Sequence, residues 1–272
     1  MHARSTILLS QGRLGDRTAG AISGASALAG ALARRTGAEV RRVGTPAEPR
    51  MDGWQDALRE AGPCLTALAG AVEAQMRAGG RALVIANTCS ASIATLPAAA
   101  RTVPGLTVLW IDAHGDFNTP ASTESSYLGG MALAGACGIW PTGHGGEVAA
   151  DRVILLGARD IDPAEDALLD QAGVRRLPAD TDPAAVVAAL GDGPVWLHID
   201  WDVMEPGAIP AAYAVPGGLV PERLRTILAA LPQDRIIGIE LAEFELPDRP
   251  EPAAAAIATI IDIIDPLLGR GA

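Results

Sequence analysis

Short runs rich in β-branched residues alternate with longer Ala- and Leu-rich stretches along almost the whole chain. The predicted strands cover residues 6–10, 39–43, 82–86, 107–111, 152–156, 174–177, 195–199 and 236–241. The predicted helices cover residues 17–35, 54–78, 93–102, 130–139, 163–172, 183–190, 221–231 and 253–268. Such alternation is typical of a parallel sheet with helices on both faces. We therefore predict an α/β fold, a single three-layer αβα domain over residues 1–272 with roughly eight parallel strands.

The charge balance and the cysteine content narrow the class of function. Acidic residues outnumber basic ones by 32 to 21, which gives a formal net charge of −11. Proteins that bind nucleic acid or anionic membranes usually carry a basic patch, so neither partner is expected. No apolar run has the length of a membrane span, and three cysteines without close pairing do not indicate a disulfide framework. We expect a reduced, cytoplasmic protein.

Two sets of metal-ligand-type residues follow predicted strands. Asp112, His114 and Asp116 come directly after residues 107–111, and Asp200 and Asp202 follow residues 195–199. In parallel sheets, ligands bind at the carboxyl ends of the strands. Alternate side chains of an extended segment point to the same face, so each set is expected to converge on one point.

A single Asp after a strand is usually a turn or a helix cap, but four carboxylates in one pocket need another explanation. Buried carboxylates repel each other and lose their hydration, and a pair of divalent cations would offset that cost. Mostly oxygen ligands with one nitrogen favour Mn²⁺ or a similar ion over a structural zinc site. Two such ions can share a bridging water and lower its pKa, so the pattern predicts a binuclear metal hydrolase.

The two motifs, in this order, resemble the ureohydrolase family, which includes arginases, agmatinases and formimidoylglutamases. The matching segments are Asp112-x-His114-x-Asp116 and Asp200-x-Asp202-x-x-x-Pro206. The resemblance extends from residue 82 to the region of Glu243, more than half of the chain. It implies a parallel αβα fold, two Mn²⁺ ions per chain and hydrolysis of an amidino group.

The resemblance also assigns roles to the acidic residues. Asp112 and Asp200 match the ligands that bridge both ions, Asp116 matches a ligand of the first ion, and His114 and Asp202 match ligands of the second. Asp116 further matches the residue that carries the proton of the bridging hydroxide to the departing amine.

Two positions depart from the family pattern. Cys89 stands where the family has its remaining metal-ligating His, and Gly129 stands where arginases have a His that shuttles protons. A thiolate can ligate a metal, although it is softer than imidazole and negatively charged, and the alternative for Cys89 is a small buried apolar residue. Without the shuttle, ordinary arginine is expected to be a poor substrate. His144 and His198 are weak substitutes, and His198 is a candidate for orienting a ligand.

Further segments resemble the substrate grip of arginases. Asn118 and Ser125 match residues that hold the α-carboxylate of the substrate, Asp162 matches the acceptor of its α-ammonium, and Glu165 matches a nearby supporting acid. Asp162 and Glu165 also suit a helix N-cap and its capping-box partner, and a cap can face a ligand as well.

A late segment supplies two more acids. Glu243 matches the acid that holds the guanidinium group, whereas Glu240 is expected to be a hydrogen-bond partner of the residues that bind the metal. Together, Asn118, Ser125 and Asp162 favour an arginine-like α-amino acid as substrate over agmatine.

The two departures together resemble the members of the family that hydrolyse Nω-hydroxy-L-arginine to hydroxyurea and L-ornithine in D-cycloserine biosynthesis. An N-hydroxy group lowers the basicity of a guanidine, and the absence of a side chain at Gly129 is expected to leave space for the added oxygen. The alternatives are an arginase or agmatinase-type amidinohydrolase, and an inactive relative that acts as a binding protein. A monomer is expected, with a trimer as the alternative.

Overall fold

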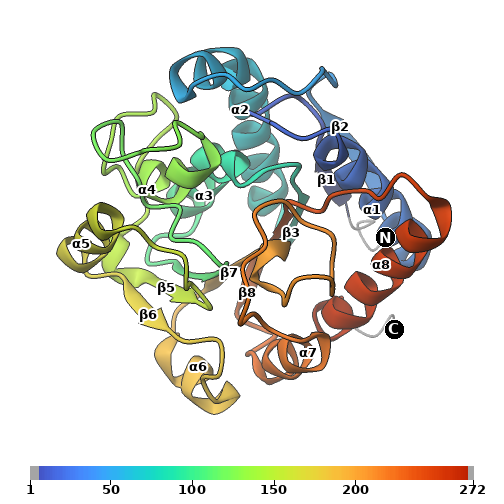
Figure 1. The fold of residues 1–272 in the computed structure, drawn as a ribbon. Helices are drawn as coiled ribbons and strands as arrows, with labels where there is room; N and C mark the ends of the chain where they lie inside the picture. The colour runs from blue at the N-terminus through green and yellow to red at the C-terminus, as the bar shows by residue number, and fades with distance from the viewer. Residues whose placement is uncertain (1–5, 269–272) are drawn as a thin grey trace.

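The computed structural model describes residues 6–268, whose strands form one parallel eight-stranded sheet in the order β2-β1-β3-β8-β7-β4-β5-β6 (Figure 1). The strands are β1 (Thr6–Ser10), β2 (Glu39–Val43), β3 (Ala82–Ile85), β4 (Thr107–Ile111), β5 (Val153–Leu156), β6 (Arg175–Leu177), β7 (Val195–Asp200) and β8 (Ile236–Ala242). The helices are α1 (Gly20–Thr36), α2 (Trp54–Arg77), α3 (Ser92–Thr102), α4 (Ala132–Ala136), α5 (Pro163–Ala172), α6 (Pro183–Ala189), α7 (Pro221–Ala230) and α8 (Pro250–Ile264). The predicted α/β class and the parallel sheet are confirmed.

Helices cover both faces of the sheet because alternate strand residues face opposite layers. Val108 and Trp110 of β4 pack in the cluster that includes α2, α3 and α4, whereas Leu109 and Ile111 pack in the cluster that includes α1, α7 and α8. Both sides of the central strands are therefore buried, which explains their nearly continuous apolar sequence. No helix within residues 6–268 is long and apolar enough to cross a membrane.

The strand predictions agree with the structure to within one or two residues, but the helix predicted over residues 130–139 is wrong. The structure has a 3₁₀ turn, η2 (Gly129–Met131), followed by the short helix α4. Gly138 has a φ of 71°, a left-handed conformation that glycine adopts without steric cost and that ends helices.

The strand order brings distant segments of the chain together. Strands β3, β8, β7 and β4 are consecutive neighbours, so the residues that follow their carboxyl ends lie along one edge of the sheet. These residues are Cys89, Glu243, Asp200 and Asp112, respectively.

Helix α1 approaches the segment after β8 so closely that one glycine is required. A Cβ at Gly24 would overlap the carbonyl oxygen of Phe244 and lie 2.9 Å from its carbon, whereas a Cβ at Gly30, on the same helix, would meet only Arg34 Nη1 at 3.5 Å. We expect Gly24→Ala to destabilise the protein by about 1–3 kcal/mol or more, and Gly30→Ala to stabilise it by about 0.5–1 kcal/mol. Urea denaturation of both variants checks this, and equal effects would contradict the packing.

Candidate active site

Asp112 and Asp200 form the centre of the site. They follow the paired residues Ile111 and Ile199 of neighbouring strands, and their side chains are almost fully buried. Asp112 Oδ1 accepts a hydrogen bond from the backbone N–H of His114 at 2.7 Å, and Asp200 Oδ1 accepts one from that of Asp202 at 2.7 Å. Each carboxylate therefore fixes the turn that carries the next ligand-type residue of its own motif.

The imidazole of His114 lies between two carboxylates. His114 Nδ1 is 2.9 Å from Asp202 Oδ2 and 3.6 Å from Asp112 Oδ1. Burial opposes protonation of the ring, but the hydrogen bonds with Asp112 and Asp202 outweigh it and raise the pKa of His114 to about 12. In the protein alone, a proton on His114 thus occupies the place where a metal cation would neutralise these carboxylates.

Asp116 is held in a strained conformation with an unpaired oxygen. Its φ is 47°, so the chain is not extended through this residue, although Asp116 still lines the same cavity as His114. The Oδ2 atom of Asp116 is buried and has no hydrogen-bond partner among the described residues. Burial and repulsion from Asp112 raise the pKa of Asp116 well above its usual value. A buried carboxylate oxygen without a donor is costly unless a cation sits beside it.

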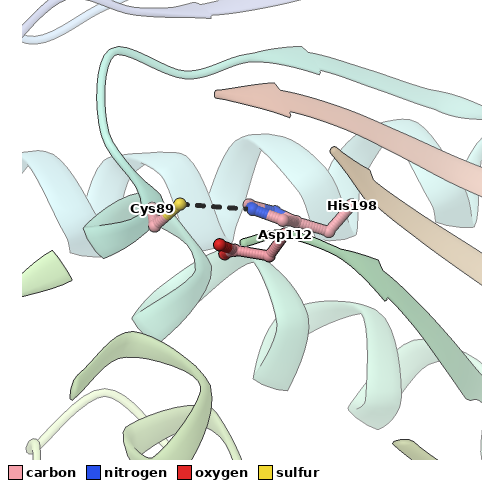
Figure 2. Close-up of side chains that lie close together, drawn as sticks. All are labelled: Cys89, Asp112 and His198. Carbon is pink, nitrogen blue, oxygen red and sulfur yellow. Dashed lines mark hydrogen bonds between the residues drawn. The ribbon is translucent and has the colours of Figure 1, made fainter. Parts of the chain in front are cut away.

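Cys89 begins the 3₁₀ turn η1 (Cys89–Ala91) after β3, and its side chain lies close to those of Asp112 and His198 (Figure 2). Its Sγ lies 3.1 Å from Asp200 Oδ2 and 3.3 Å from His198 Nε2. Burial, followed by repulsion from Asp200, raises the pKa of the Cys89 thiol well above its usual value. A thiolate at this position therefore requires a neighbouring cation.

A buried chain of polar groups lies behind Cys89. The ring of His198 stacks on Trp110 with centroids 3.6 Å apart, and His198 Nδ1 is 3.4 Å from Glu240 Oε2. Ser92 donates to Glu240 Oε2 at 2.7 Å. A carboxylate beside one ring nitrogen orients the other, so His198 Nε2 is directed at Cys89. The location predicted for Glu240, behind the ligand-type residues, agrees with this arrangement.

The donor atoms fit a pair of divalent ions. Within residues 6–268, three groups have ligand atoms within 4.8 Å of one another: Asp112, His114 and Asp202; Cys89, Asp200 and Glu243; and Cys89, Asp112 and His198. The unpaired Asp116 Oδ2 lies in the same cavity. Mostly oxygen donors with a few nitrogen and sulfur atoms suit Mn²⁺ or a similar transition ion better than Ca²⁺ or a closed zinc site.

These residues form the floor of a cavity of about 470 Å³. All the sequence-predicted site residues except the fully buried Asp112 line it: Cys89, His114, Asp116, Asn118, Ser125, Asp162, Glu165, Asp200, Asp202 and Glu243. The non-glycine residues with positive φ within residues 6–268 are Asp116, Ser126, Tyr213 and Glu243. Three of them line this cavity, and Ser126 lies between two lining residues. Such strain is typical of functional sites.

Asp162 both caps a helix and faces the cavity. Its Oδ1 accepts hydrogen bonds from the backbone N–H groups of Ala164 and Glu165 at the start of α5, and its Oδ2 accepts one from Asn118 Nδ2 at 3.1 Å. The capping-box alternative for Glu165 is wrong, because Glu165 Oε1 instead accepts from the backbone N–H of Phe117 at 2.7 Å. Burial raises the pKa of Glu165 to about 7.

Ser125 is exposed and lines the same cavity as Asn118 and Asp162. Ser125 Oγ accepts a hydrogen bond from the backbone N–H of Tyr127 at 3.2 Å.

The expectation of open space beside Gly129 is wrong. A Cβ at Gly129 would lie 2.8 Å from Cζ of Tyr127, so the ring of Tyr127 already fills this place. Tyr127, Tyr213 and Arg17 also line the cavity, and the sequence analysis missed them. The signal available was weak: Tyr127 lies two positions before Gly129 and is one of only two tyrosines in the chain.

Comparisons with known proteins agree with this geometry. The model of the arginase family matches residues 12–264. A Streptomyces lavendulae protein named N(omega)-hydroxy-L-arginine amidinohydrolase is 45% identical over 267 residues, which cover 98% of each chain. Arginase from Bacillus caldovelox superimposes with a TM-score of 0.83 at 24% identity over 98% of this chain and 99% of that chain. Arginase from Entamoeba histolytica, in complex with L-ornithine, superimposes with a TM-score of 0.87 at 18% identity over 98% of each chain. With its buried carboxylates at the ends of β4 and β7 and this match along almost its whole length, the chain belongs to the arginase family.

Proposed function

We propose that this protein hydrolyses Nω-hydroxy-L-arginine to hydroxyurea and L-ornithine with two Mn²⁺ ions. The observation that carries the proposal is the cavity itself, where ligand-type acids, Cys89 and the amino-acid grip of Asn118 and Asp162 meet. The match of 45% identity over 98% of both chains to a protein named for this substrate supports it. Hydroxyurea contains an N–O bond, so we further propose that the reaction serves the biosynthesis of an antibiotic of the D-cycloserine type.

The residues divide between two ion positions. Cys89 and Asp116 would hold the first ion, His114 and Asp202 the second, and Asp112 and Asp200 would be shared by both. Two ions held by these residues would lower the pKa of a bound water and so supply hydroxide near neutral pH. His198 directs its Nε2 at Cys89 and so holds the sulfur in place.

The remaining residues position the substrate. Asp162 would bind the α-ammonium, and Asn118, which donates a hydrogen bond to Asp162 Oδ2 at 3.1 Å, would bind the α-carboxylate together with Ser125. Glu243 is fixed by the backbone N–H of Cys89 at 2.9 Å and would hold the hydroxyguanidino group. The substrate is thereby held at both ends, which converts attack by water into an effectively intramolecular step.

Asp116 would transfer the proton of the attacking water to the leaving group. Asp116 lines the cavity, and the carboxylate oxygen that does not hold the ion can accept the proton of the attacking water. The hydroxyl adds to the amidine carbon, the bond from this carbon to the ornithine nitrogen breaks, and that nitrogen leaves with the proton from Asp116. One water is consumed, and hydroxyurea and ornithine account for all atoms.

A substrate panel tests the proposal. General acid–base help is typically worth about 10²–10⁴-fold, and Gly129 cannot provide it, so kcat/KM for Nω-hydroxy-L-arginine is expected to exceed that for L-arginine by about 10² or more. Agmatine should be a poorer substrate still because it lacks the α-amino acid group. Formimidoylglutamate should also be poorer because it lacks the long side chain that extends through the cavity. Activity is measured with added Mn²⁺ and with chelator. A preference for arginine would overturn the assignment, and the absence of both turnover and bound metal would favour a binding protein.

A further inference from the structure

The hydroxyl group of Tyr127 lies at the floor of the cavity, next to the acid that would hold the reacting end of the substrate. Tyr127 Oη donates a hydrogen bond to Glu243 Oε1 at 3.1 Å. Both residues line the cavity, and they come from segments that are 116 positions apart in the sequence. The phenol is therefore placed at the reacting end of the cavity by the fold.

Gly129 makes this placement of the ring possible. A Cβ at Gly129 would lie 2.8 Å from Cζ of Tyr127, closer than real Cβ atoms come to other atoms, and 3.1 Å from Cδ1, so the ring would have to move. Gly129 does not have a positive φ, so its backbone conformation does not require glycine. Glycine at this position serves to admit the tyrosine ring.

Neighbouring side chains fix the ring on its other sides. The guanidinium carbon of Arg17 lies 4.9 Å from the centroid of the Tyr127 ring, and Arg17 Nη2 donates to the backbone carbonyl of Ser125 at 3.1 Å. The ring of Tyr213 lies 5.5 Å away, centroid to centroid. A stacked cation and a second ring restrict the phenol to small movements.

The chemistry of the reacting group explains why a hydroxyl is useful here. A guanidinium group offers only N–H donors, which carboxylate oxygens such as those of Glu243 accept. An N-hydroxylated guanidine adds an oxygen, which is a hydrogen-bond acceptor, and ionised carboxylates cannot donate to it. Tyr127 can: Glu243 Oε1 keeps its hydrogen bond from the backbone N–H of Cys89 at 2.9 Å, so the phenol O–H can turn away without leaving that oxygen unpaired.

We propose that Tyr127, admitted by Gly129, donates a hydrogen bond to the hydroxyl oxygen of the substrate and determines the preference for an N-hydroxylated guanidine over an unsubstituted one. This inference rests on the proposed function, of which it specifies one contact. A site built to hydrogen-bond a substrate hydroxyl discriminates strongly against the analogue that lacks it, because its own donor is then left unpaired.

The first experiment compares Tyr127→Phe with Tyr213→Phe, which removes a hydroxyl from the neighbouring, half-exposed ring. For Tyr127→Phe, kcat/KM for Nω-hydroxy-L-arginine is expected to fall by about 10–10²-fold, while that for L-arginine changes less than about threefold. The ratio of the two values is expected to stay unchanged in Tyr213→Phe. Circular dichroism and the melting temperature establish that each variant is folded.

A double-mutant cycle tests the part assigned to Gly129. Gly129→Ala must displace the ring, so it is expected to lower the same ratio about tenfold or more, and to have no such effect when Tyr127 is already alanine. Equal effects of Gly129→Ala in both backgrounds would overturn the assignment.

The outcomes separate this inference from the proposed function. If the unmodified protein does not turn over Nω-hydroxy-L-arginine, the proposed function fails and this contact fails with it. If the protein does turn it over and Tyr127→Phe keeps the ratio, or lowers both substrates equally, only the role of Tyr127 is overturned. If both substrates are affected equally, the phenol only supports Glu243.

Discussion

Asp200→Asn is expected to abolish hydrolysis, with a fall in kcat/KM on the order of 10³-fold or more, because one of the two central acids can no longer hold a cation. Asparagine has the same shape and keeps an oxygen that can accept the hydrogen bond from the backbone N–H of Asp202 at 2.7 Å, so the turn after β7 should persist. Metal content per chain, measured by elemental analysis after dialysis, is expected to fall in parallel with activity.

Without metal, the same substitution is expected to stabilise the protein, although it abolishes activity. Burial and repulsion from Asp202 raise the pKa of Asp200 well above its usual value, which means that the ionised carboxylate destabilises the fold when no cation is present. Removing this charge should therefore raise the melting temperature of the chelated protein at pH 8. Asp192→Asn, at an exposed position after α6, is the matched control and should change neither activity nor metal content. A loss of activity in Asp200→Asn with full metal content would contradict the role given to this residue.

The stabilisation of the protein by Mn²⁺ is expected to grow as pH rises from about 5 to 8. Burial, followed by repulsion from Asp112, raises the pKa of Asp202 to about 6, and burial raises that of Glu165 to about 7. Both folded-state values lie above the ordinary carboxyl pKa, so the stability that their protons provide is complete below about pH 4 and is lost as pH rises through 6 and 7. The metal-free protein should thus become less stable over this range.

Metal binding has the opposite dependence on pH. Ligands bind cations in their deprotonated form, so protons on Asp202 and on His114, whose pKa is about 12, compete with the ion, and they compete less at higher pH. At a concentration of 100 times Kd, a bound ligand adds about 2.7 kcal/mol of stability.

The measurement is the melting temperature with Mn²⁺ and with chelator at pH 5.5, 6.5 and 8. The difference between the two should widen with pH, and activity should disappear in chelator and return with Mn²⁺. A difference that is constant or shrinks would contradict the assignment of Asp202 and His114 as ligands, and Asp200→Asn, which has lost one of the two central acids, should show little difference at any pH.

The short-range features of the fold were predictable because they depend on neighbours in sequence. Helix α5 begins and ends at the predicted residues because Asp162, Pro163 and Gly173 supply its cap, its first turn and its left-handed end. Helix α4 was overestimated because Ala-rich sequence favours a helix, while the bend at Gly138 depends on a close approach to Gly146, eight positions later.

The candidate site was predictable only in part. The motifs around Asp112 and Asp200 are local, and their place after strands pointed to one edge of the sheet. The conformation of Asp116 did not follow the alternation of an extended strand, because its backbone carbonyl accepts hydrogen bonds from Leu133 and Ala134, at the start of α4.

The amino-acid sequence by itself determined the alternation of strands and helices and the presence of two acid-rich motifs after strands, since both depend on residues a few positions apart. Only the tertiary structure decided which segments meet. The order β3-β8-β7-β4 places Cys89 against His198 and Asp200, more than a hundred positions away. The ring of Tyr127 fills the space that was expected to be open beside Gly129, and its hydroxyl group contacts Glu243. Contacts between distant segments arise from shared burial in the folded chain, and no local pattern records them.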